Sequence, residues 1–147
     1  MDFDSFKRHA ERTGQGVFSN LHFQSIRRVL MVKFRFQDLD IWKKAITIAD
    51  DLFDIADELE QKKLFRFAEQ LRGSGLSMSN NIAEGSASNS QKVFRRYLNI
   101  ARNSTFENAN VIIMLERRSL IETEEKEALL NDLDHLCRMI TNLKKSL

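Results

Sequence analysis

The chain of 147 residues carries a formal net charge of +2, with 30% of its residues charged and a single cysteine. This length suits one domain with a buried core, and one cysteine excludes an intramolecular disulfide framework and fits a reducing cytoplasm. The small net charge excludes the strong overall field of a DNA-coating protein, and no apolar run reaches the about 18–20 residues of a membrane span, so we expect a cytoplasmic protein without a membrane partner.

The first 32 residues follow no sustained period. Gly14 and Gly16 interrupt any helix there, and Met31 stands just before the strongly patterned region. Residues 1–32 are either a short extension that packs on the body or the product of an upstream start with Met31 as the natural first residue, and we favour the second. Residues 33–36 alternate polar and apolar side chains, which predicts a short extended lead-in.

Four helices are expected over the remaining domain, residues 33–147. The chain has no proline and five glycines, which favours long helices. Apolar side chains recur at steps of three and four residues, which predicts helices at about 38–59, 62–84, 90–118 and 123–146. In the last helix this stripe is a heptad seam that runs from Leu129 to Leu147, and short connections between the helices predict an all-α, antiparallel up-and-down four-helix bundle.

Capping residues mark the expected helix ends. Asp38 or Asp40 should cap the first helix, Asn89 or Ser90 the third, and Thr123 the fourth. The two lysines near the end of the chain, 144 and 145, suit the negative end of the fourth helix.

Glycines punctuate the second helix. Gly73 and Gly75 each cost roughly 1 kcal/mol relative to alanine, which indicates close backbone approach to a neighbour or a local bend. Gly85 is expected to stop the helix.

A small polar face accompanies the apolar stripe of the second helix. Ser74, Ser77, Asn81 and Glu84 are spaced three, four and three residues apart, so they share one side of it. We favour a contact between helices or subunits for this face over a solvated surface, and both over a ligand site.

Three segments of the sequence resemble a known family. They are FQDLDIWKKA (36–45), QLRGSGLSMSNNIAEGS (70–86) and FRRYLNIARNSTFENAN (94–110), and their order and spacing are similar to those of the four-helix-bundle proteins of the 23S rRNA intervening-sequence family. The resemblance covers residues 34–147. The chain departs from the family at Ser79, where proline is frequent, and at Ala109, where a second acidic residue is frequent.

The resemblance implies a small bacterial bundle that assembles into a ring, commonly a pentamer, and has no established enzymatic activity. The family is also similar to the accessory proteins of diversity-generating retroelements, which bind nucleic acid and a reverse transcriptase. The resemblance therefore implies RNA or DNA as a partner, by analogy of fold.

No catalytic, cofactor or metal constellation emerges from the residues. A di-iron bundle needs two Glu-x-x-His motifs, and the nearest match is the single Asp132–His135. His135 and Cys137 diverge on a helix and cannot share a zinc ion, and Cys137 is expected to be a small buried hydrophobe. His9 and His22 lie outside the bundle.

Basic side chains follow helical steps on the third helix, on a face directed away from its core. Such cations can bond phosphates, with Tyr97 nearby as a stacking surface, or can form salt bridges on an ordinary solvated surface. The second helix adds three further candidates. The candidate nucleic-acid-binding residues are Lys92, Arg95, Arg96, Asn99, Arg102, Lys62, Lys63 and Arg66.

Apolar residues on more than one side of the third helix, including Ile100 and Ile113, predict a homo-oligomer, because a monomer would expose some of them. We therefore expect a non-enzymatic, homo-oligomeric bundle that binds RNA or DNA. The alternative is a scaffold or adaptor that contacts a protein partner through a helix face and has no nucleic-acid role.

Overall fold

The structure is a computed structural model that describes residues 32–147, so the expectations for residues 1–31 lie outside it. The chain divides into two units between Lys33 and Phe34, and the second unit is the helical bundle. Its elements are η1 (Arg35–Asp38), a 3₁₀ helix, and the α-helices α3 (Asp40–Gln61), α4 (Phe65–Ser86), α5 (Gln91–Arg117) and α6 (Thr123–Ser146).

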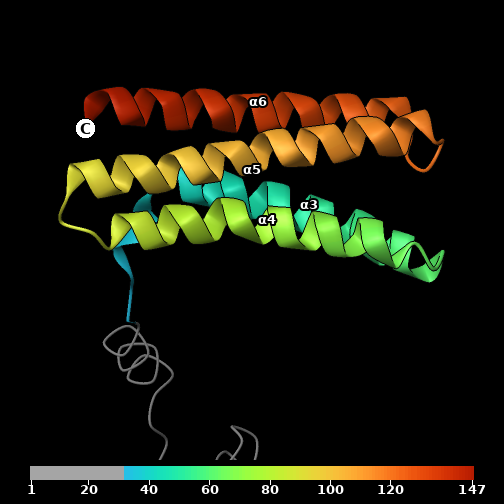
Figure 1. Cartoon of the computed structure of the whole chain (residues 1–147), viewed down its shortest axis with the longest axis horizontal. Coiled ribbons are helices and arrows are strands. Elements are labelled where there is room, and N and C mark those ends of the chain that lie inside the picture. Colours follow the sequence, from blue (N-terminus) through green and yellow to red (C-terminus); the bar gives the residue numbers. More distant parts are fainter. Residues whose placement is uncertain (1–31) are drawn as a thin grey trace, which may run out of the picture. The chain divides into compact units, whose positions relative to one another are not determined.

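The four α-helices form an antiparallel up-and-down bundle, which confirms the predicted fold class. α3 packs on α4, α4 on α5, α5 on α6, and α6 also contacts α3 (Figure 1). We call the end that holds the connection at residues 87–90 the single-loop end; there α5 begins and α6 ends. The other, double-loop end holds the connections at residues 62–64 and 118–122.

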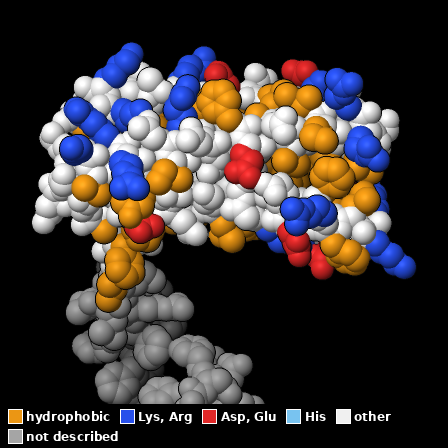
Figure 2. Space-filling model, in the orientation of Figure 1, with side chains coloured by type: hydrophobic (Ala, Val, Ile, Leu, Met, Phe, Trp, Pro, Cys, Tyr) orange, Lys and Arg blue, Asp and Glu red, His pale blue; other side chains and the backbone are white. Residues whose placement is uncertain are grey.

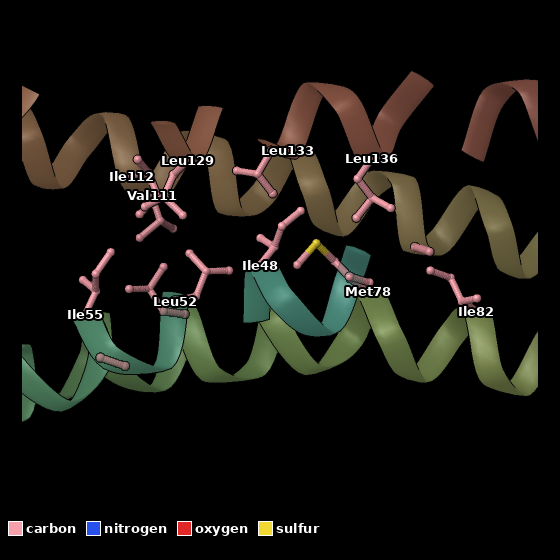
Figure 3. Close-up of a cluster of buried hydrophobic side chains, with 14 of the residues drawn as sticks. Ile48, Leu52, Ile55, Met78, Ile82, Val111, Ile112, Leu129, Leu133 and Leu136 are labelled. Carbon is pink, nitrogen blue, oxygen red and sulfur yellow. The ribbon is translucent and has the colours of Figure 1, made fainter. Parts of the chain in front are cut away.

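The core lies between all four helices. Side chains such as Leu52 of α3, Met78 of α4, Ile112 of α5 and Leu136 of α6 are fully buried and point toward one another (Figure 3). Burying such a side chain contributes about 1.5–3 kcal/mol to stability. The apolar periods of the four helices therefore account for their association.

Both connections at the double-loop end turn in the same way. After α3, the N–H of Lys63 bonds Glu60 O (2.9 Å) and the N–H of Leu64 bonds Leu59 O (2.8 Å), with Lys63 at φ 60°. This is a Schellman motif, and it stops the helix with a residue in the left-handed region. α5 ends likewise, with Ser119 at φ 55°.

These turns explain the largest boundary difference. The sequence predicts a second helix from about Lys62, but the left-handed turn at Lys63 ends α3 at Gln61 and delays α4 to Phe65. The predicted extended lead-in is also wrong in part, because Arg35–Asp38 form η1.

Helix starts follow the predicted caps at one position. Ser90 caps α5 as expected, and its hydroxyl accepts from the backbone N–H of Val93. The N-caps of α3 and α6 are Leu39 and Glu122, and neither makes a side-chain capping bond. Thr123 is instead the first residue of α6.

The glycines of α4 have three different surroundings. A Cβ added to Gly85 would lie 2.6 Å from Tyr97 Cβ and 2.8 Å from Phe94 Cδ2, so α5 approaches α4 more closely there than a side chain would permit. Gly85 lies inside α4, which ends at Ser86, and does not stop the helix. A Cβ on Gly75 would contact Phe53 at 3.3 Å, whereas one on Gly73 would meet no heavy atom within 4 Å.

Candidate nucleic-acid interface

The first turns of α5 present the main group of basic side chains that the sequence singles out. The cap at Ser90 begins the helix immediately before them, and the helical period places them on one outward side. Arg102 is partly buried and the others are exposed: Lys92, Arg95, Arg96 and Asn99.

The last turns of α6 run beside this face and add cations to it. Lys144 donates a hydrogen bond through Nζ to the side-chain oxygen of Asn99. Arg138 and Lys145 line a groove between α5 and α6 together with Arg102. Sequence reasoning missed this contribution. The heptad seam of α6, laid antiparallel on α5, is the signal that could have placed these lysines beside Asn99.

Two acid-free stretches of the chain meet here. Neither residues 91–106 nor residues 136–147 contain Asp or Glu. Figure 2 shows Lys and Arg side chains gathered over the single-loop end, where α5 begins and α6 ends. We call this surface the basic corner, and it comprises Lys92, Arg95, Arg96, Asn99, Arg102, Arg138, Lys144 and Lys145.

Most cations of the basic corner are not neutralised by described acids. Within residues 32–147, the salt bridges include none to Lys92, Arg95 or Arg96, whereas Arg138 pairs with Asp134 at 3.1 Å. Cations without acidic partners maintain a positive local potential, which attracts phosphate groups.

The remaining basic candidates lie at the opposite end of the bundle. Lys62 and Lys63 are in the α3–α4 connection and Arg66 is in the first turn of α4. α4 has 22 residues, so its length of about 30 Å separates them from the start of α5. They therefore do not extend the basic corner, because the antiparallel hairpin carries them away from it.

A groove of about 470 Å³ runs between α5 and α6. Arg102, Arg138 and Lys145 line it, and Phe106 adds an aromatic ring that is 57% exposed. The guanidinium carbon of Arg102 lies 5.0 Å from the centre of that ring, in a cation–π contact.

The cysteine also lines this groove and is not the buried hydrophobe that the sequence predicts. Cys137 is half-buried, and its Sγ lies 2.6 Å from the hydroxyl oxygen of Thr105. Its position between α5 and α6, next to the basic corner, makes it a reporter for whatever enters the groove.

Tyr97 is directed away from the basic corner. Its hydroxyl donates to Glu84 Oε1 at 2.8 Å, and this hydrogen bond to a carboxylate raises the pKa of Tyr97 above its usual value. Its ring also packs over Gly85. Phe106 is therefore the exposed ring beside these cations, and Tyr97 belongs to the α4–α5 contact.

The small polar face of α4 lies against α5. Ser74, Ser77 and Glu84 each bond a side chain of α5, while Asn81 bonds the backbone oxygen of Ser77 on its own helix at 2.7 Å. We call this row the polar seam. Its bonded pairs are Gln70–Glu107, Ser74–Asn108, Ser77–Ser104 and Glu84–Tyr97.

Over residues 32–147, no three His, Cys, Asp or Glu side chains are grouped as metal ligands would be. In the same part of the chain, no helix combines the length and apolar character needed to cross a bilayer.

Comparison with known proteins gives one family match. Residues 37–142 match the family model described as 23S rRNA-intervening sequence protein, a range that begins in η1 and ends in α6. A crystal structure from Bacteroides thetaiotaomicron VPI-5482, described as a protein with unknown function from the S23 ribosomal protein family, is similar with a TM-score of 0.68 and 25% identity. The match covers 71% of this chain and 98% of that chain. No curated protein matches the chain.

Proposed function

The chain belongs to the 23S rRNA-intervening sequence protein family, and from this premise we propose that it is a non-enzymatic, homo-oligomeric bundle that binds RNA or DNA through the basic corner. The observation that carries the proposal is the meeting of two acid-free stretches, from α5 and α6, at the single-loop end. Such a surface offers several cations to a phosphodiester backbone, and within residues 32–147 Arg138 is the one among them that forms a salt bridge.

Self-association is the second part of the proposal, with five subunits as the family resemblance implies. Several apolar side chains lie outside the core, with exposed fractions between 39% and 47%: Leu76, Val93, Ile100, Ile113 and Met114. A second copy of the chain could cover such side chains. An oligomer would also present the basic corner several times, which multiplies a weak attraction for one long polyanion.

Two matched charge reversals test the nucleic-acid role. The first variant, Lys92→Glu/Arg95→Glu/Arg96→Glu, reverses three cations of the basic corner. The second, Lys62→Glu/Lys63→Glu/Arg66→Glu, changes the net charge by the same amount at the double-loop end. Affinity for labelled single-stranded and duplex RNA and DNA is measured by fluorescence anisotropy, from about 50 mM salt upward.

We expect the first variant to lose at least about tenfold in affinity and the second to bind like the wild type. Each lost phosphate contact should also reduce the slope of log affinity against log salt by about one. Light scattering is used to check that both variants keep the wild-type mass. Equal losses of affinity in the two variants would show that binding depends on net charge and not on the basic corner. No binding to any probe at about 50 mM salt would overturn the proposal in favour of a protein scaffold.

A further inference from the structure

The α5–α6 groove combines features that the bundle core does not need. Phe106 is 57% exposed, so its ring contributes little to the buried apolar interface. It stands beside Arg102, which lies over the ring, in a groove that also contains Lys145. An exposed aromatic ring among cations is the combination with which proteins hold single-stranded nucleic acid, because bases stack on the ring while the cations bond phosphates.

The charges of the groove favour an anionic occupant. Among residues 32–147, Asp134 is the one acid that lines it, and this carboxylate is paired with Arg138 at 3.1 Å. Arg102 and Lys145 then remain to interact with a ligand, and neither forms a salt bridge with an acid within residues 32–147. Lys145 of the groove is followed back along α6 by Lys144, whose Nζ donates to the side-chain oxygen of Asn99 on α5, so cations of the groove and of the basic corner are neighbours in sequence.

The size of the groove fits one unstacked nucleotide. Its volume of about 470 Å³ lies within the range of sites that hold small ligands, and the exposed ring of Phe106 is part of its lining. In a duplex the bases are stacked and paired with one another, so their flat faces are not available to a protein ring. A single strand can turn a base outward and place it on the ring.

We propose that the α5–α6 groove selects single-stranded over duplex nucleic acid, with a base stacked on Phe106 and the adjacent phosphates bound by Arg102 and Lys145. This inference rests on the proposed function, since it assigns a strand preference to the same basic surface. It separates two tasks on one surface. Lys92, Arg95 and Arg96 attract any phosphodiester backbone, and the groove recognises an unpaired base.

The first test compares three probes that differ in their bases. They are an oligothymidine of about 12 nucleotides, a duplex of the same length, and an abasic strand that keeps the phosphates. Oligouridine is run in parallel to separate RNA from DNA. We expect the wild-type chain to bind the oligothymidine about tenfold more tightly than the abasic strand, and Phe106→Ala to remove this difference while abasic binding stays unchanged.

Two further variants isolate the ring. Phe65→Ala removes a phenylalanine that is 55% exposed at the double-loop end, so it controls for loss of an exposed ring anywhere on the bundle. Phe106→Tyr keeps an aromatic face and should restore the base preference. Because Phe106 lies outside the core, both alanine variants are expected to fold, which circular dichroism checks.

The second test uses Cys137 as a reporter inside the groove. The cysteine is the single thiol of the chain, so its reaction with a chromogenic disulfide reagent reports one site. We expect saturating oligothymidine to slow this reaction several-fold, and saturating duplex, which does not place a base in the groove, to slow it clearly less. The same measurement in Phe106→Ala should show weaker protection.

The outcomes distinguish the two proposals. If no probe binds, the proposed function itself fails. If probes bind but duplex, abasic and normal strands bind equally in the wild type, or Phe106→Ala keeps the base preference, the groove proposal fails while the backbone contact stands. Protection of Cys137 by duplex as strongly as by single strand would likewise overturn it.

Discussion

At the scale of single residues, Gly85 sets the distance between α4 and α5. A side chain there would reach within 3 Å of both Tyr97 and Phe94. Tyr97 can therefore lie over the α4 backbone and donate to Glu84, one residue before the glycine. The absence of a Cβ at Gly85 thus allows the first turns of α5, which carry several cations of the basic corner, to pack closely on α4.

Gly85→Ala and Gly73→Ala are expected to change stability in opposite directions. The first adds a methyl group against Tyr97 and Phe94 and should lower the free energy of unfolding by about 1–3 kcal/mol. The second adds a methyl group in open space within a helix and should raise it by about 0.5–1 kcal/mol. Urea unfolding followed by circular dichroism measures both, and a loss of stability in Gly73→Ala would show that this face is already in contact with something else.

Sequence alone could not separate these glycines. All three lie in or directly after one predicted helix, and the pattern could predict close approach or a bend for Gly73 and Gly75 and a stop at Gly85. What distinguishes them is the position of α5 and of Phe53, which depends on how the helices cross. Close approach was expected at Gly73 and Gly75, but the structure shows the closest approach at Gly85.

At the scale of helices, the polar seam explains why α4 and α5 carry serine and asparagine at positions that face each other. Asn108 is fully buried, and its side-chain oxygen accepts from Ser74 at 2.6 Å while its nitrogen donates to Ser104 O at 2.8 Å. A buried amide must be bonded in this way, since an unsatisfied polar group costs about 1–3 kcal/mol. The seam therefore fixes the register of the two helices.

Ser74→Ala should lower the free energy of unfolding by about 1–3 kcal/mol, because it leaves the side-chain oxygen of Asn108 without its donor. Ser79→Ala is the matched control. Ser79 is also buried in α4, but its hydroxyl donates to Leu76 O of its own helix, so its removal should change stability by less than about 0.5 kcal/mol. Equal losses in the two variants, measured by urea unfolding, would contradict a role for the cross-helix bond.

The helices themselves could be predicted from the sequence because apolar residues recur at helical spacing over long segments and the chain contains no proline. The ends were less predictable. Lys63 and Ser119 adopt left-handed conformations that usually belong to glycine, and nothing in those residue types announces a Schellman motif. The second helix was accordingly expected about three residues too early.

At the scale of the whole molecule, the apolar side chains that remain outside the core predict association. Ile100, Ile113 and Met114 are about 40% exposed in the single chain. Analytical ultracentrifugation at micromolar concentration is expected to give a mass that is a multiple of 17.2 kDa. Replacing these residues by lysine one at a time should locate the interface without unfolding the bundle, and a single folded chain of 17.2 kDa in the wild type would contradict the expectation.

The candidate site was only partly predictable from the sequence. The shared face of the cations on α5 could be predicted from helical spacing, because these residues lie on a single helix. The contribution of Lys144 and Lys145 depends on the pairing of α6 with α5, and the separation of Lys62 from Lys92 depends on the direction of α4. Sites assembled from two elements thus require the topology, which a periodic pattern does not contain.

The matching Schellman turns make the bundle divisible. α3 with α4 and α5 with α6 form two helical hairpins whose turns have the same hydrogen bonds. Within the described chain, residues 87–90 are the one linker that joins the two hairpins. Cleavage of the backbone within residues 87–90 would leave each hairpin with its own Schellman turn and with the apolar face that packs against the other hairpin. The molecule can thus be regarded as a dimer of hairpins that happens to be encoded in one piece.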